Sequence, residues 1–122
     1  MNVWGTGPFE NDEAAGWSDD LDAAPDPASY AAATLERDRV PGRVVAAAAW
    51  FVAGLPGTAA PPDGPQTPPV TPDADLADDA VEALGDVLDD PAWVSRWDDP
   101  MDRETAQAYV RSLVETWEVA IG

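Results

Sequence analysis

The stretch VVAAAAWFVA, residues 44–53, is apolar at every position. A helix on a protein surface keeps one polar face, whereas a helix that is apolar all round must be enclosed by its neighbours. Pro41 and Gly42 precede this stretch and GLPG, residues 54–57, follows it, so turn-forming residues bound it on both sides. The sequence therefore predicts a central, buried helix around which other helices pack.

Two amphipathic segments follow in the C-terminal half, each with apolar residues at helical spacing. The first stripe comprises Leu76, Ala77, Ala80, Val81, Leu84, Val87 and Leu88, and it lies opposite Asp75, Asp78, Asp79, Glu82 and Asp86. The second stripe comprises Ala106, Tyr109, Val110, Leu113, Val114, Trp117, Ala120 and Ile121. Between them Asp90 and Pro91 open a short helical turn that carries Trp93 and Trp97. Each long segment is expected to pack one face and to keep the other in solvent.

Two further helices are predicted before the central one. Asn11 is a good N-cap, with Asp12 in the positive first turn, and the pattern ends at Pro25. Asp26 followed by Pro27 is a second start signal, because proline at the first helical position loses no helical hydrogen bond. This second helix is expected to reach about residue 37.

No segment alternates apolar and polar residues with a period of two, so a sheet is not supported. The predicted fold is all-α: a small, irregular bundle of about four main helices plus one short helix, as one domain over residues 1–122. Residues 1–9 are expected to form an ordered N-terminal loop. Residues 56–72, PGTAAPPDGPQTPPVTP, hold seven of the 13 prolines and are interpreted as an extended or mobile linker rather than a docking motif. Deleting most of residues 58–69 is then expected to cost little stability, because loop length enters the closure entropy only logarithmically.

The charge is strongly one-sided, with 24 acidic residues against six basic ones and a net charge of -18. Such a field repels nucleic acid and anionic membranes and attracts basic proteins. We therefore expect no direct nucleic-acid binding and no membrane association. With no cysteine, no visible signal peptide and no apolar run near the roughly 20 residues of a membrane span, a cytoplasmic location is expected.

Histidine, cysteine and lysine are all absent. This absence removes the usual general base, thiolate and Schiff-base chemistry and leaves carboxylates assisted by arginine, tyrosine or hydroxyl groups. Adjacent acids such as Asp78 and Asp79 are more simply explained as solvated faces or helix caps. The densest acidic run, residues 73–79, lacks the glycine and glutamate spacing of an EF-hand. No catalytic residue, metal site or cofactor is predicted, and an enzyme is not favoured.

The segment WGTGPFENDEAAGW, residues 4–17, combines paired glycines, aromatic residues and a helix start, which indicates a specified shape. One interpretation is a ligand loop, with the candidate binding residues Trp4, Gly5, Gly7, Phe9, Glu10, Asn11, Asp12 and Trp17. The other is a structural clasp, in which the aromatic side chains plug the bundle and the glycines permit a tight path. The clasp is favoured, because paired aromatic side chains in such loops usually serve packing.

The same residues resemble a family of small bacterial proteins described as domain of unknown function 4259. Its members begin with a Trp-Gly-x-Gly-x-Phe block followed by acidic residues, Asn, Asp and a Trp. The likeness continues through an alanine-rich central helix, the helix ADDAVEALGDVL and the segment around Trp97. Family members often carry Ser-Glu-Leu and Leu-Trp-Glu in the region that here reads WVSRWDD, residues 93–99. A role tied to the glutamate of those family motifs therefore does not carry over to this chain. The resemblance implies a fold and a class, with no activity, cofactor or catalytic residue to transfer.

Three functional hypotheses follow. The leading one is a non-enzymatic interaction module with a basic protein partner, of the inhibitor, immunity-protein or antitoxin kind. The alternative is a carboxylate-based hydrolase or divalent-cation-binding domain with its site near Glu10, Asn11 and Asp12. In the third, the acidity serves solubility alone and a partner contacts exposed tryptophans. The oligomeric state stays open.

Overall fold

A computed structural model of the protein describes residues 9, 11–38, 40–55, 64–70 and 74–121. These residues form helices and no strand, which confirms the all-α prediction. The helices are α1 (Asp12–Ala23), α2 (Pro27–Arg37), α3 (Pro41–Val52), α4 (Ala74–Asp89), α5 (Pro91–Val94) and α6 (Pro100–Ile121). Five of them are long, one more than the roughly four expected, and α5 is the short one. Within these residues, no helix has both the length and the apolar character to cross a membrane.

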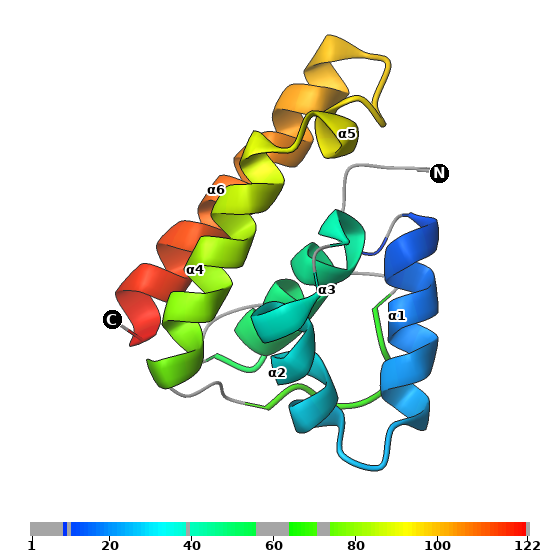
Figure 1. Ribbon diagram of the computed structural model, residues 1–122, viewed down its shortest axis with the longest axis vertical. Coiled ribbons are helices and arrows are strands. Elements are labelled where there is room, and N and C mark those ends of the chain that lie inside the picture. The colour runs from blue at the N-terminus through cyan, green and yellow to red at the C-terminus, as the bar shows by residue number, and fades with distance from the viewer. Residues whose placement is uncertain (1–8, 10, 39, 56–63, 71–73, 122) are drawn as a thin grey trace.

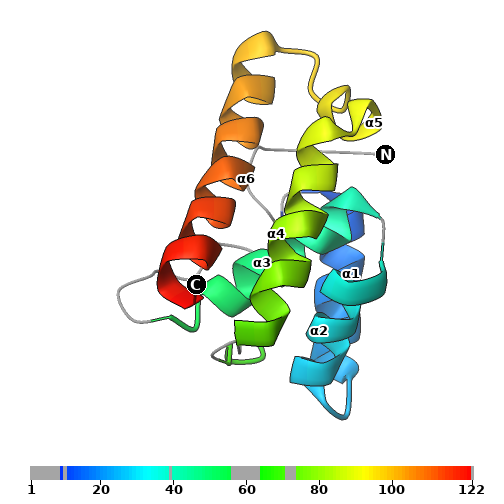
Figure 2. The ribbon, with the colours of Figure 1, turned by 60° about the vertical axis from the view of Figure 1, so that its left-hand side comes forward.

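The helices pack around α3 (Figure 1). The two longest helices, α4 and α6, run side by side in opposite directions, as Figure 2 also shows. On the other side of α3 lies α1, and α2 contacts α1, α3 and α4. The central position predicted for the segment around residues 44–53 is therefore confirmed.

The burial of α3 explains its composition. Every residue from Val44 to Phe51 is buried, and the four successive alanines leave room for the backbones of neighbouring helices to approach. At the end of α3 the Phe51 ring meets Trp117 of α6 edge-on, with ring centroids 6.0 Å apart. The helix begins at Pro41, three residues before the apolar run, because proline is well suited to the first helical position.

The predicted start signals act as caps. The Asn11 carboxamide accepts the Ala14 N–H at 2.9 Å, and Asp26 accepts the Ser29 N–H at 3.2 Å. The short helix α5 ends at Val94, so Trp97 lies outside it and helical spacing does not relate the two tryptophans. Trp93 and Trp97 nevertheless pack edge to face at 5.0 Å in the core, because the turn after α5 folds the chain back.

Residues 64–70, which we name the strap, are held by specific contacts and differ in this from the expected linker. The Asp22 carboxylate at the end of α1 accepts the Gln66 N–H at 3.0 Å, the Thr67 N–H at 2.8 Å and the Thr67 hydroxyl at 2.6 Å. The Trp50 indole N–H donates to the Thr67 carbonyl at 3.1 Å. The hydrogen bond from the Thr67 hydroxyl is the main cause that lowers the pKa of Asp22. The strap contains no helix or strand and bends at Gln66 and Thr67, and it is anchored to α1 and α3.

Deleting residues 58–69 is consequently expected to destabilise the protein by about 1–3 kcal/mol, because it removes four hydrogen bonds and uncovers Trp50. Loop-closure entropy alone would make this deletion nearly neutral. Thermal unfolding followed by circular dichroism measures the difference. An unchanged melting temperature would show that the strap contributes nothing to stability.

Candidate functional site

The described members of the N-terminal motif make internal contacts. Phe9 and Trp17 are each 1% exposed and Asn11 is 4% exposed, whereas Asp12 is exposed. The Trp17 indole N–H donates to the Thr34 hydroxyl of α2 at 2.9 Å. Trp4, Gly5, Gly7 and Glu10 lie outside the described residues. These contacts are the ones expected of a clasp, because the rings of Phe9 and Trp17 are buried against the protein's own residues.

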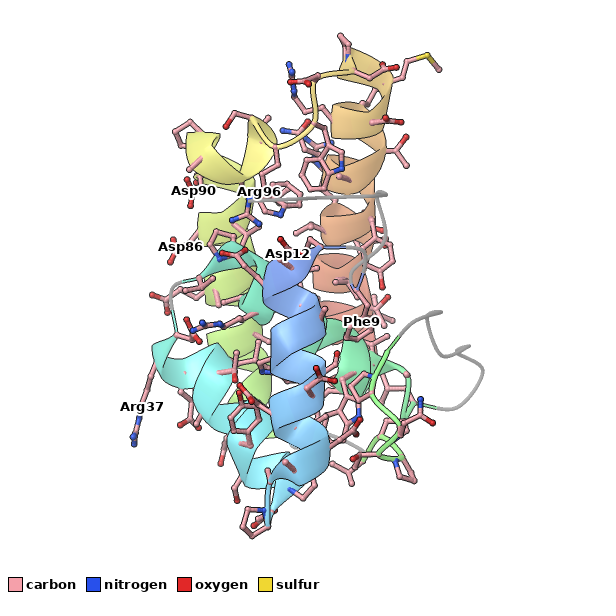
Figure 3. All side chains as sticks on the ribbon, turned by 90° about the vertical axis from the view of Figure 1, so that its right-hand side faces the viewer. Phe9, Asp12, Arg37, Asp86, Asp90 and Arg96 are labelled. Carbon is pink, nitrogen blue, oxygen red and sulfur yellow. The ribbon has the colours of Figure 1, made fainter. Side chains whose placement is uncertain are left out.

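The acidic end of the motif joins three elements at one point. Glu13, in the first turn of α1, accepts the Gly42 N–H of α3 at 3.0 Å through Oε1. The same oxygen lies 2.6 Å from Nη1 of Arg96, which follows α5. Figure 3 shows Arg96 reaching from the end of α5 towards the first turn of α1, where Asp12 is labelled. Glu13 therefore ties the starts of α1 and α3 to the α5 segment.

Gly42 is required at this junction. A Cβ atom there would lie 2.7 Å from Cβ of Glu13 and 2.8 Å from Oδ1 of Asn11, too close for either contact. The missing side chain lets α3 begin directly against the capped start of α1. The sequence showed Gly42 only as a turn residue, and nothing in it named Glu13 and Arg96 as its neighbours.

Beside this junction lies a pocket of about 230 Å³ between the α2–α3 turn and α4. It is lined by Asp38, Pro41, Val44, Ala83, Asp86, Val87 and Asp90. The last four of these residues recur at helical spacing along one face of α4 and the residue that follows it, so they reach the pocket together. The floor is apolar, with Val44 and Val87 buried, and three carboxylates surround it.

The three carboxylates differ in their partners. Asp38 ends α2, accepts the Val40 N–H at 2.9 Å and lies 3.4 Å from Nη1 of Arg43. Asp90 caps α5 by accepting the Ala92 N–H at 2.9 Å. Asp86 is exposed, and the described residues offer it no hydrogen bond or ion pair. Asp86 is thus the carboxylate with most free capacity to bind a ligand.

The pocket is suited to a cation attached to an apolar stem. Carboxylates accept hydrogen bonds from ammonium or guanidinium groups, and the apolar floor matches the methylene stem of lysine or arginine. Within the described part of the chain, no group of three or more acidic residues is arranged to hold a metal ion. Burial raises the pKa of Tyr109 to about 12.

This pocket was not predicted from the sequence. Asp86 was placed on the wet face of its helix, which is correct, and Asp90 was recognised as a helix start. Asp38 was not associated with these two residues. It lines the same pocket only because α2 ends beside α4. The helical spacing of residues 83–90 was the one local signal, and it does not reveal a facing carboxylate.

Comparison with known protein families places the chain beside a described family. A family model described as domain of unknown function (DUF4259) matches residues 2–109. No curated protein and no solved structure matches significantly. The matched range includes the N-terminal motif, the Glu13–Gly42–Arg96 junction and every residue that lines the pocket.

Proposed function

The chain belongs to the DUF4259 family, and we propose that it is a non-enzymatic interaction module that binds a basic protein. The acidic pocket between the α2–α3 turn and α4 is the anchor point, and it receives an arginine or lysine side chain of the partner. The observation that carries this proposal is the pocket itself, with its apolar floor and three carboxylates.

The charge of the surrounding surface supports the proposal, because the arginines neutralise little of it. The described residues contain two ion pairs, Arg43–Asp38 and Arg96–Glu13. Arg103 donates to the Trp97 carbonyl instead, and Arg37 extends away from the helices (Figure 3). The uncompensated exposed acids on α1, α4 and α6 include Asp12, Asp19, Asp20, Asp75, Asp78, Glu82, Asp86, Asp89, Asp102, Glu104, Glu115 and Glu118. Their field steers a cationic partner and repels nucleic acid.

The pocket adds specificity to this long-range attraction. A guanidinium group is planar and pairs well with carboxylates, so it can bind Asp86 while its stem lies over Val44 and Val87. The stem of a lysine would make the same apolar contact. Its ammonium group, however, is a point charge without the planar geometry that pairs with a carboxylate. We therefore expect arginine to be preferred over lysine.

The hydrolase or cation-binding alternative near residues 10–12 gains no support from the described contacts. The Asn11 carboxamide is engaged as the cap of α1, and Trp17, proposed as a wall of that site, lies in the core. Asp12 is exposed on the first turn of α1, where an acid stabilises the positive helix end.

The pocket can be tested with a hexa-arginine peptide as probe. Titration of the labelled protein is expected to shift the methyl resonances of Val44 and Val87 in a saturable way. Asp86→Asn should weaken binding by at least about tenfold, because one charge-assisted hydrogen bond contributes about 1.5–3 kcal/mol. The control Asp19→Asn removes the same charge from an exposed position on α1 and should change the affinity less than twofold.

Two results would contradict the proposal. If Asp86→Asn and Asp19→Asn weaken binding equally, only the overall field acts and the pocket is not the anchor. If hexa-arginine does not bind even at an ionic strength of about 0.05 M, where screening is weak, the acidic surface is not a binding surface for basic partners.

A further inference from the structure

We propose that Phe9, Trp50 and Asp22 form a binding groove for an extended, proline-containing segment of a partner protein, and that the strap occupies this groove in the structure. The groove lies apart from the acidic pocket and shares none of its lining residues. The strap acts as an internal competitor, so the partner binds by displacing it.

The chemistry of the contact is that of proline-rich peptide recognition. Extended proline-containing peptides dock on aromatic side chains and have backbone carbonyls free to accept hydrogen bonds. Here the Trp50 indole N–H donates to the carbonyl of Thr67, which precedes two prolines. Pro65 and Pro69, on either side of Thr67, line a narrow apolar gap of about 40 Å³ together with Phe9 and Trp50. The chain's own segment thus shows which ligand chemistry the groove accepts.

Phe9 closes one end of the groove. A methyl group built on Gly64 would lie 3.1 Å from the Phe9 ring, so the strap backbone runs directly against that ring. In Figure 3 Phe9 lies on the same side of α1 as the strap. Under the strap, Phe9 is 1% exposed and Trp50 is 3% exposed, and displacement of the strap would expose both apolar surfaces. A partner segment would cover them again.

Asp22 supplies the polar half of the recognition. Its carboxylate binds two successive backbone N–H groups and one hydroxyl, at 2.6–3.0 Å. With the Trp50 bond, three of the four hydrogen bonds use backbone atoms of the strap. Backbone contacts are available to any extended chain, so the only sequence requirements are prolines flanking a serine or threonine. A partner segment of that kind can reproduce every contact that the strap makes.

The strap is also suited to displacement. It has no helical or strand hydrogen bonds of its own, and Gln66, Pro68 and Val70 are exposed. Such segments open with a lower free energy than the global unfolding of the protein. Because the strap is covalently tethered, its effective concentration is on the order of millimolar, and a free peptide competes poorly with it. Peptide binding to the groove becomes measurable when the strap is replaced by a sequence that does not occupy it.

The first experiment replaces residues 65–69 with Gly-Ser-Gly-Ser-Gly in the full chain and adds a synthetic peptide with the sequence of residues 64–70, GPQTPPV. Saturable binding is expected, with a shift of the Trp50 indole N–H resonance. Adding Asp22→Asn to this variant should weaken binding at least tenfold, and a GAQTAAV peptide should bind at least tenfold more weakly. If the folded variant does not bind GPQTPPV, the proposal is wrong.

The second experiment uses the unaltered protein, so it tests whether the strap opens independently of global unfolding even if the variant fails to fold. Hydrogen exchange should show that the Gln66 and Thr67 amides open at least 100-fold more often than amides of α3 such as Ala48. If these amides exchange only at the rate of the α3 amides, the strap opens only when the whole protein unfolds. No partner segment could then reach the groove, and the proposal would be overturned.

Discussion

Replacing Trp17 with alanine is expected to lower the free energy of unfolding by about 3–5 kcal/mol. Trp17 is 1% exposed, and it is among the largest fully buried side chains of the described residues. Its indole N–H donates to the Thr34 hydroxyl, and its ring packs on Tyr30 at 5.9 Å. The substitution therefore leaves a large cavity and removes a link between α1 and α2. Urea unfolding followed by circular dichroism measures the change.

Trp117 provides a matched comparison. It is 0% exposed, but in the described part of the chain its indole N–H has no hydrogen-bond partner. Trp17→Phe loses a buried hydrogen bond and Trp117→Phe loses none, so Trp17→Phe should cost about 1 kcal/mol more. A loss below about 1 kcal/mol for Trp17→Ala would mean that the core does not depend on this side chain.

The second large effect is expected at the Glu13–Arg96 ion pair. Glu13→Gln should destabilise the protein by about 3 kcal/mol, because it leaves the Arg96 charge buried without its partner. The side chains of Arg96 and Glu13 are 10% and 13% exposed, so water replaces little of the lost attraction. Glutamine retains an oxygen that can accept the Gly42 N–H, and the change therefore isolates the charge. Nη1 of Arg96 lies near the carboxylate without hydrogen-bond alignment, so the attraction is mainly electrostatic.

Two further variants test that interpretation. In Glu13→Gln with Arg96→Met both charges are absent, and part of the lost stability should return, because no unpaired charge remains buried. Arg43→Met breaks the ion pair with Asp38, in which the arginine side chain is 48% exposed, and should cost less than about 1 kcal/mol. Equal losses for Glu13→Gln and Arg43→Met would contradict a special role of the buried pair.

Most helices could be predicted from the sequence because their signals are local. Asn11 and Asp26 begin helices with contacts to residues three positions away, and the apolar run after Pro41 requires enclosure on all sides. These patterns depend on backbone geometry that every helix shares. The short helix α5 was recognised from Asp90 and Pro91, whereas its early end at Val94 was not.

The binding features were harder to predict, because each combines residues that are far apart in the chain. No local pattern distinguishes Asp22 from the other acids of α1, because its role depends on Thr67, 45 residues away. Proline content indicated an extended segment but not the surface on which it lies. In the same way, Asp38 and Asp86 share a pocket only because α2 and α4 are neighbours.

By itself, the sequence determined the helical class, the starts of most helices, the enclosed position of α3 and the negative charge of the surface. These properties follow from the spacing of residues within a few turns and from composition, and neither depends on how helices are arranged. Only the tertiary structure decided that Glu13 meets Gly42 and Arg96, that three aspartates surround one apolar pocket, and that the strap covers Trp50. Such contacts arise from the packing of whole helices, which places residues together regardless of their separation in the chain.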